Sequence, residues 1–520
     1  MRNLPRLAVF ILAAALLLGP GASRAGANPP QEADFERLLE FGRTLAGQGK
    51  HAEAVIRYWQ IVDQGDARQR YRQDAEFELA QSLLELGLHL SAYTFLESIA
   101  DAGEAHPHYG ASLPRLLEVQ RKVPGDFRPL EKLALYPPDS FPDELADELR
   151  FLVGQYHYTE GNLDQSLEIL EQVRRANEHF YLRARYLIGV VHVRRNAAQP
   201  AVEAFRDLLR YKRESGSSSE VVREFGERGL LGLARIFYSI AGRFVQEPDR
   251  RRELFESAVR HYDEMARFSQ FWLDALFEVS WAHYQLGNYG RALGNLHSLA
   301  SPYFEEHYYP EAMVLQAVIF HDLCYHDTAI ELIDDFIRDY WPLQRELENQ
   351  IGSYADPNEF YAFLARLAAD ESVLSLRLRR IFNAALSDRK LSRQLGLVVV
   401  LNRELEGLSK LGSHAAAAEL VDVLRGDVIA YRELVVGEAG EQARSRLQRV
   451  HADLKDLLAQ ALRVKFEALA GQKQSIDPSG VEGVAPRVSS EHIRWRFQGE
   501  YWRDELGSYV FNIPSLCAPQ

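Results

Sequence analysis

Seven times along this chain, a small residue is followed four positions later by a large apolar residue and seven positions later by another. Positions i, i+4 and i+7 share one face of an α-helix, so each set predicts the buried face of a helix. The sets are Ala54, Tyr58 and Ile61; Ala92, Leu96 and Ile99; Ser166, Leu170 and Val173; Ala201, Phe205 and Leu208; Ala258, Tyr262 and Met265; Ala292, Leu296 and Leu299; and Ala329, Ile333 and Phe336. A chain of 520 residues is too long for one compact core, and this pattern favours an array of repeated units.

A second small residue precedes each set and predicts a second helix in every unit. It stands twelve positions earlier in six units, and in the fifth unit an insertion around Phe244 to Arg252 separates it. These residues are Gly42, Ala80, Gly154, Gly189, Ala234, Ser280 and Ala317. Four units also carry glycine five positions before the set, at Gly49, Gly87, Gly161 and Gly287, where it would end the first helix in the left-handed conformation. Such helix pairs cannot bury their faces alone, so neighbouring units must stack as a solenoid.

These units resemble the tetratricopeptide (TPR) repeat family. The residues that match the TPR consensus at the expected offsets are Gly42, Ala54, Tyr58, Ile61, Gly154, Gly161, Ser166, Leu170, Val173, Ala292, Leu296 and Leu299. The resemblance covers roughly residues 35–106 and 147–343. The consensus proline is mostly missing, although Pro302 and Pro342 stand near its place, and the signature tryptophan is absent. A related helix-pair solenoid is therefore the structural alternative.

Residues 1–27 have the pattern of a secretory signal. Arg2 and Arg6 precede an apolar run from Leu7 to Leu18, and Ala25-Gly26-Ala27 fits a cleavage site. A run of this length is too short to span a bilayer, which needs about 20 residues. We expect an exported chain without an integral membrane span after cleavage, located in the periplasm; an uncleaved N-terminal anchor is the alternative.

The predicted fold class is all-α: a TPR-like helix-pair solenoid, then long helices or a coiled coil, then a small C-terminal β-hairpin. Seven of the 21 prolines fall within residues 107–142, which predicts a connector with short helices that splits the array. The expected divisions are a signal peptide at 1–27, repeats one and two at 28–106, the connector at 107–146, repeats three to seven at 147–343, a long-helix region at 344–472, a linker at 473–490 and the hairpin at 491–520.

A heptad-like stripe runs along the end of the long-helix region. Its residues alternate steps of four and three: Ala443, Leu447, Val450, Leu454, Leu457, Ala461, Val464 and Ala468. This stripe predicts either a coiled-coil seam between chains or a long helix that packs against its own chain.

Two short stretches near the C-terminus alternate with a period of two and predict the strands of the hairpin. One contains Ile493, Trp495 and Phe497, and the other contains Tyr509, Phe511 and Ile513. The segment Trp495–Gly507 also resembles the C-terminal segment of large TPR envelope proteins of gliding deltaproteobacteria. That resemblance implies a role in an envelope assembly, near motility or surface machinery, and no chemistry.

The sequence offers little support for catalysis or cofactor binding. It lacks phosphate-binding glycine loops and the common nucleophile and metalloprotease motifs, and a net charge of −14 argues against nucleic-acid binding. His321, Cys324, His326 and Asp327 could supply zinc ligands, but they straddle the turn between two helices, where Asp327 would cap the second. Cys324 and Cys517 could instead form a disulfide in an oxidising compartment, or remain one packed and one loose thiol.

The first helices of such a solenoid line its concave face, which predicts where a partner binds. The residues expected to point into this groove are Phe151, Gln155, Tyr158, Tyr186, Phe277, Trp281 and Tyr284. Aromatic side chains give anchoring area to a peptide partner, although large apolar side chains more often pack neighbouring repeats. The favoured hypothesis is a non-enzymatic exported scaffold for another envelope protein, without metal or cofactor. The alternatives are a strut that self-associates through residues 443–468 and an enzyme acting on peptidoglycan or peptides within residues 344–472.

Overall fold

The protein is described here by a computed structural model that covers residues 32–64, 69–123, 125–369, 374–386, 389–474 and 498–517. Within these ranges the regular structure is helical, and there is no β-strand. The α-helices are α1 (Glu32–Gly47), α2 (His51–Val62), α3 (Gln69–Glu85), α4 (His89–Ala102), α5 (Tyr109–Lys122), α6 (Arg128–Leu133), α7 (Ala146–Glu160), α8 (Leu163–Leu170), α9 (Glu178–Arg194), α10 (Ala198–Ser215), α11 (Glu220–Ala241), α12 (Pro248–Asp263), α13 (Trp272–Gln285), α14 (Tyr289–Leu299), α15 (Pro310–Asp322), α16 (His326–Ser353), α17 (Pro357–Ala369), α18 (Leu376–Leu386), α19 (Arg389–Leu411) and α20 (Ala418–Gln474).

The seven predicted helix pairs are present. Units one and two are α1–α2 and α3–α4, and units three to seven are the consecutive pairs from α7–α8 to α15–α16. In each pair the two helices pack against each other, and all 21 residues of the seven repeated sets are buried. The solenoid predicted from the spacing of small and large residues is therefore confirmed.

The small residues of the first helices act as predicted by admitting the large residue of the second helix. A Cβ atom added to Gly42 would lie 2.4 Å from the Tyr58 ring, and one added to Gly189 would lie 2.6 Å from the Phe205 ring. These distances are shorter than any real Cβ contact, so only glycine lets the two helices approach this closely.

The residue that ends the first helix takes the left-handed conformation, also as predicted. The φ angles are positive at all four glycines singled out for this role, Gly49, Gly87, Gly161 and Gly287. In units four and seven the equivalent positions are Asn196 and Cys324, which also have positive φ angles, 57° and 64°. Asparagine tolerates this conformation, whereas for cysteine it is uncommon. The unusual backbone of Cys324 marks a site that its surroundings must hold in place.

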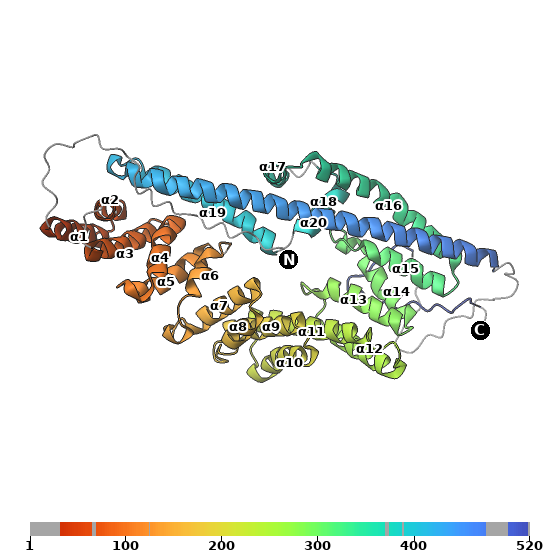
Figure 1. Cartoon of the computed structure of the whole chain (residues 1–520). Helices are drawn as coiled ribbons and strands as arrows, with labels where there is room; N and C mark the ends of the chain where they lie inside the picture. Colours follow the sequence, from red (N-terminus) through yellow and green to blue (C-terminus); the bar gives the residue numbers. More distant parts are fainter. Residues whose placement is uncertain are drawn as a thin grey trace.

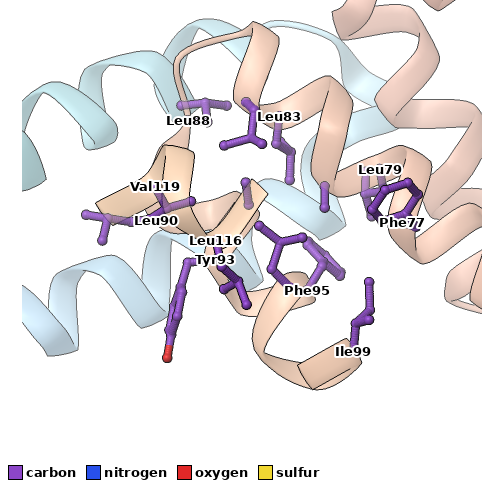
Figure 2. Packing of buried hydrophobic residues seen from close by; sticks show 14 of the residues in the cluster. Phe77, Leu79, Leu83, Leu88, Leu90, Tyr93, Phe95, Ile99, Leu116 and Val119 are labelled. Carbon is purple, nitrogen blue, oxygen red and sulfur yellow. The ribbon is translucent and has the colours of Figure 1, made fainter. Parts of the chain in front are cut away.

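The hydrophobic core continues through the proline-rich stretch. Helix α5 packs against α4, and α6 lies between α5 and α7. One cluster of buried side chains extends from unit one through both short helices into unit three. Figure 2 shows the part of this cluster in which Leu83, Leu90, Phe95 and Leu116 from α3, α4 and α5 meet. Proline therefore shortens the helices here, but the stacking is not interrupted.

The first helices of neighbouring units lie next to one another along the array. Helix α7 contacts α9, and α9 contacts α11, while the second helices of units three to six pack against the first helices on either side of them; α16, in unit seven, packs against α15 and α20. Figure 1 shows α10 and α12 on the side of the solenoid that faces away from α20. We call the surface made of α7, α9, α11, α13 and α15 the first-helix face.

Helix α20 runs back along the solenoid and joins its two ends (Figure 1). Its 57 residues correspond to a length of about 85 Å. It packs against α15, α16, α17 and α18 along one part of its length, and against α19 and α4 along another. Five seam residues are fully or almost fully buried within this chain: Ala443, Leu447, Leu454, Ala461 and Ala468. The predicted stripe is thus used for packing within the chain.

The predicted C-terminal β-hairpin is wrong for the residues that the structure describes. Residues 498–517 form a tail without strand pairing, with turns at 503–508 and no regular structure at 509–516, and the first predicted strand, around Ile493 to Phe497, lies outside the described residues. The alternating apolar side chains of the tail pack onto helices instead, with Tyr509 and Ile513 against the core of units five to seven. A period of two identifies extended backbone, but it does not specify whether a strand or a helix surface lies beside it.

No helix in the described ranges combines the length and apolarity needed to cross a bilayer. The segment with the pattern of a secretory signal, residues 1–27, lies outside these ranges.

Candidate partner-binding surfaces

The seven residues predicted to bind a partner lie on three helices of the first-helix face. Phe151, Gln155 and Tyr158 are on α7, Tyr186 is on α9, and Phe277, Trp281 and Tyr284 are on α13. All seven are partly buried, so each shares its surface between neighbouring helices and solvent. The six aromatic residues among them pack against three separate clusters of the core, and the structure therefore does not bring them together as one site.

The aromatic residues on α7 and α9 are engaged mainly by their own neighbours. The Phe151 ring lies 6.0 Å from the Phe180 ring, and the Arg194 guanidinium lies 5.2 Å from the centre of the Tyr158 ring. Tyr186 packs between Phe205 and Phe225, with ring centres 5.8 Å away in each case. These contacts hold adjacent units together, which limits how much of each ring a partner could contact.

The residues on α13 form a denser group with α15 next to it. Trp281 and Tyr284 make an edge-to-face contact at 5.8 Å, and Phe277 lies 5.5 Å from the Tyr309 ring. The Tyr284 hydroxyl donates a hydrogen bond of 2.9 Å to the Asp322 carboxylate. Burial, reinforced by this carboxylate, raises the pKa of Tyr284, so the residue stays a neutral donor.

Charged groups surround this aromatic group. The Arg235 guanidinium of α11 pairs with both carboxylate oxygens of Glu278, which also accepts a hydrogen bond of 2.8 Å from the Tyr262 hydroxyl. The Tyr309 hydroxyl donates to Asp274 over 2.7 Å. The surface shared by α11, α13 and α15 therefore combines rings with fixed, hydrogen-bonded carboxylates.

Helix α20 contributes to the same part of the first-helix face. Burial raises the pKa of Glu311 on α15, and the negative charge of Asp453 on α20 raises it further, while a hydrogen bond from Trp281 opposes the shift. The Trp281 indole of α13 thus faces a carboxylate of α15, and α20, which packs against α15, adds the negative charge of Asp453 nearby. We call Asp274, Glu278, Trp281, Tyr284 and Glu311 the acidic–aromatic strip. It can hydrogen-bond and stack with a peptide, and it suits a partner with cationic side chains.

A second surface, on the outer side of unit six, is occupied by the C-terminal tail. Gly290 and Gly294 lie one helical turn apart on α14, and the tail backbone crosses directly over them. Added Cβ atoms would lie 2.2 Å from the Phe511 carbonyl oxygen and 1.7 Å from the Tyr509 carbonyl oxygen. The amide of Phe511 donates a hydrogen bond of 2.9 Å to the Gly290 carbonyl. We call this surface, with Trp272, Ser298 and His297 beside the two glycines, the outer groove.

The tail is anchored in the outer groove by a leucine and a glycine. Leu506 is fully buried in the core of unit six, and Gly507 follows it with a φ angle of 81°. A Cβ atom on Gly507 would lie 2.7 Å from the Trp272 ring, so both its conformation and its position require glycine. Its amide donates a hydrogen bond of 2.8 Å to the buried Ser298 hydroxyl.

Polar and aromatic contacts extend the attachment on both sides of this anchor. Arg267 donates hydrogen bonds to the Asp504 carbonyl, at 2.8 Å, and to the Ser508 hydroxyl. The His297 ring stacks on Tyr501 at 4.7 Å and meets Tyr509 edge-on at 5.0 Å. The tail is therefore recognised through its backbone and through particular side chains.

A disulfide bond between Cys324 and Cys517 fixes the end of the tail. The two Cα atoms are 5.2 Å apart, and the Leu516 amide donates a hydrogen bond of 2.9 Å to the Leu323 carbonyl beside the bond. Because the Cys324 sulfur is used in this bond, the zinc site considered for His321, Cys324 and His326 loses its thiolate. Among the described residues, no group of three or more potential ligands is arranged to hold a metal ion.

The outer groove was not predicted from the sequence. The sequence feature that could have indicated this groove is a pair of glycines four residues apart in the second helix of unit six, Gly290 and Gly294. Glycine inside a helix lowers helix stability by up to about 1 kcal/mol relative to alanine, so two on one face indicate a structural reason for their presence.

No protein-family model matches the chain, and no curated protein matches its sequence. Among solved structures, the chain is similar to a tetratricopeptide repeat protein from Parabacteroides merdae, with 11% identity over 58% of this chain and 91% of that one and a TM-score of 0.21. It is also similar to the human IFIT1 dimer with m7Gppp-AAAA, with 16% identity over 76% and 80% of the two chains and a TM-score of 0.28.

Yeast Tom70 gives a further match, with 14% identity over 86% of this chain and 98% of that one and a TM-score of 0.19. Identities and TM-scores of this size carry no functional argument. The TPR-like fold of this chain rests on the packing of its own seven units.

Proposed function

We propose that this chain is an exported, non-enzymatic scaffold that holds a protein or peptide partner on the first-helix face of its solenoid. The observation that carries the proposal is the acidic–aromatic strip. Its carboxylates are fixed by hydrogen bonds and its rings are only partly covered, as a surface needs to be to bind without losing much conformational entropy.

Two observations support the export of the chain. Residues 1–27 have the charge and apolar pattern of a secretory signal, and the two cysteines of the chain lie within bonding distance of each other. Disulfides persist in oxidising compartments such as a periplasm. The resemblance of Trp495–Gly507 to envelope TPR proteins suggests a cell-envelope assembly, near motility or surface machinery, as the setting.

The alternative of an oligomeric strut through residues 443–468 is less well supported. The buried seam residues, such as Leu447 and Leu454, already pack against helices of their own chain, and a coiled coil would have to displace that packing. The alternative of an enzyme within residues 344–472 is also less well supported. The buried carboxylate of that region, Glu404, has a structural role, because it accepts hydrogen bonds at the start of α4.

The proposal is tested by recovering the partner from cells after cross-linking. Trp281→Ala combined with Tyr284→Ala should reduce partner recovery at least tenfold, because both rings and the hydrogen bond to Asp322 are lost from the strip. Trp341→Ala, on the exposed surface of α16, is the matched control and should leave recovery unchanged. Equal recovery for the double variant and the control, with unchanged thermal melting, would remove the strip from the proposal.

A further inference from the structure

We propose that the outer groove of unit six is a second binding site for extended peptides, and that it can take the C-terminal tail of a second copy of this chain. The site is centred on a second helix, α14, and shares no residue with the acidic–aromatic strip.

The shape of the groove is specific for a peptide backbone. Any residue larger than glycine at position 290 or 294 would place a Cβ atom inside a carbonyl oxygen of the tail. The Gly290 carbonyl meanwhile accepts the Phe511 amide hydrogen. Helix α14 thus offers a surface on which an extended chain lies in direct contact with the helix backbone. Without such a contact, two helical glycines on one face would only destabilise the helix.

The groove also selects the sequence that it binds. A deep apolar site takes Leu506, the Trp272 ring excludes any side chain at Gly507, and the Ser298 hydroxyl accepts the amide of Gly507. His297 contacts aromatic rings on both sides of this anchor, at Tyr501 and Tyr509. The recognised pattern is therefore leucine and glycine flanked by aromatic residues, which every copy of this chain carries.

The chain length between α20 and the tail permits exchange. Residues 475–497 link Gln474 to Gln498, and 23 residues can reach about 80 Å when fully extended. Exchange of an identical element between copies uses the same contacts as the intramolecular arrangement, so it needs no new interface. A short tether favours the tail of the same chain, and exchange therefore depends on a high local concentration of copies.

Apolar side chains of the docked tail remain exposed, which gives two copies that have exchanged tails a surface for further contact. Trp502, Val510 and Phe511 remain 41%, 44% and 38% exposed although the tail is bound. Apolar groups exposed together beside a binding groove favour association with a like surface over contact with water.

The disulfide shows which copy supplies the tail in the groove, because it joins the tail covalently to the chain that it occupies. Cys324 belongs to the chain that supplies the groove, and Cys517 belongs to the chain that supplies the tail. Two cysteine thiols and one glutathione disulfide yield the protein disulfide and two molecules of reduced glutathione. When the thiols come from two copies, the same reaction joins the copies covalently.

The experiment mixes two full-length variants with different affinity tags. The tail donor carries Cys324→Ser and the groove donor carries Cys517→Ser, so a Cys324–Cys517 bond can form only between chains. The mixture is concentrated and oxidised with glutathione disulfide. We expect a covalent heterodimer on a non-reducing gel, with the Cys324–Cys517 linkage identified by mass spectrometry. Each variant oxidised alone is the control for nonspecific linkage.

Glycine substitutions should change the heterodimer yield in opposite directions, depending on which of the two variants carries them. Gly290→Ala with Gly294→Ala in the groove donor should lower the heterodimer yield at least fivefold, because the groove is blocked. The same pair in the tail donor should raise the yield, because that chain can no longer hold its own tail. Gly426→Ala on α20, where an added Cβ meets no other atom within 4 Å, is the matched control and should change neither.

Circular dichroism separates these effects from misfolding, because alanine on α14 should preserve or increase helix content. A heterodimer yield no higher than that of the single variants, or a yield that the groove substitutions leave unchanged, would overturn the proposal.

Discussion

The C-terminal part of the chain is fastened to the two ends of the solenoid by different chemistry. At unit two and the connector that follows it, the contacts of α19 and α20 include the buried carboxylates Glu404 and Asp126. At units six and seven the attachment combines apolar packing by α20, polar side-chain contacts such as the Lys465–Asp334 ion pair, contacts of the tail and one disulfide bond. The comparison shows that α20 can be held at both ends by two interfaces of different composition.

The attachment at the N-terminal end depends on two buried carboxylates. Glu404 on α19 is 2% exposed and accepts hydrogen bonds from the Ser91 amide, at 2.9 Å, and the Ser91 hydroxyl, at 2.8 Å. Asp126 is fully buried, pairs with Arg128 and accepts a hydrogen bond of 3.0 Å from the Tyr431 hydroxyl of α20. Hydrogen bonds to Glu404, and an ion pair and a hydrogen bond to Asp126, offset the cost of burying these two charges. The contact is therefore specific but sensitive to the loss of a partner.

The attachment at the other end depends on shape. Leu454, Leu458 and Ala461 of α20 pack between α15 and α16. A Cβ atom on Gly471 would lie 2.5 Å from the His326 ring, so α20 approaches the start of α16 very closely. Because apolar packing is not directional, we expect the apolar contacts at this end to tolerate conservative changes and to respond mainly to changes in side-chain volume.

The largest expected effect is the loss of the ion pair between the buried Asp126 carboxylate and the partly exposed Arg128. Arg128→Ala should lower the free energy of unfolding by about 3 kcal/mol, because it leaves the Asp126 carboxylate buried without its cation. The Arg128 guanidinium also lies 3.4 Å from the centre of the Tyr431 ring, so its loss weakens the contact with α20 directly. Urea denaturation measures the change. Arg338→Ala, which removes an exposed pair with Asp335, is the control and should cost less than about 1 kcal/mol.

The next effect concerns the disulfide at the opposite end. Cys517→Ser should lower stability by about 2–4 kcal/mol, because the bond closes a long loop and restricts the unfolded chain. Limited proteolysis should cut the tail of this variant more readily while the contact around Glu404 stays protected. Protection of the tail equal to that of the oxidised protein would show that the noncovalent contacts of the tail suffice to hold it.

A smaller effect is expected at Glu404, with a characteristic pH dependence. Glu404→Ala leaves buried amides at the start of α4 without an acceptor and should cost about 1–3 kcal/mol. Burial raises the pKa of Glu404 despite the hydrogen bonds from Ser91, so the folded chain binds this proton more tightly than the unfolded chain. The contribution of Glu404 to stability should therefore fall as the pH rises above about 4.5.

Glu404→Gln keeps an oxygen acceptor but cannot ionise, so it should remove this part of the pH dependence. Thermal melting of both proteins between pH 4 and pH 8 gives the comparison. A parallel pH dependence in the two proteins would contradict the assignment to Glu404.

The smallest effect compares two helical glycines. Gly426→Ala should raise stability by up to about 1 kcal/mol, because alanine is the better helix former and meets no neighbour. Gly294→Ala should give no such gain, because the same helix benefit is offset by displacement of the tail backbone at Tyr509. Matched thermal melts of the oxidised proteins measure the difference. An equal gain at both positions would show that the tail adapts without cost.

The repeat units were predicted from the sequence in detail, down to the positive φ angles of Gly49 and Gly161. Each unit depends on residues close together in the chain, so its pattern is local and visible. The candidate strip was predicted in part: Trp281 and Tyr284 lie on the first-helix face as expected. Their acidic neighbours, and the arrival of Asp453 from α20, depend on contacts between residues far apart in the sequence.

The outer groove shows most clearly which features could not be predicted from the sequence. Gly290 and Gly294 have no evident purpose until a tail about 200 residues later lies across them, and the same tail was predicted to be a hairpin. Extended backbone and helical glycines are each compatible with several neighbours. Only the folded structure, in which the tail backbone fits the surface of α14, shows which neighbour each of them has.

The sequence by itself determined the helix pairs and their stacking, because the spacing of small and large side chains fixes which faces must be buried within and between adjacent units. The tertiary structure alone decided that α20 returns to the first units, that its apolar stripe is satisfied within the chain, and that the tail is held at Cys324. The physical reason is that hydrophobic burial has no preferred partner, so long-range pairing depends on shape, buried charge and chain reach rather than on local pattern.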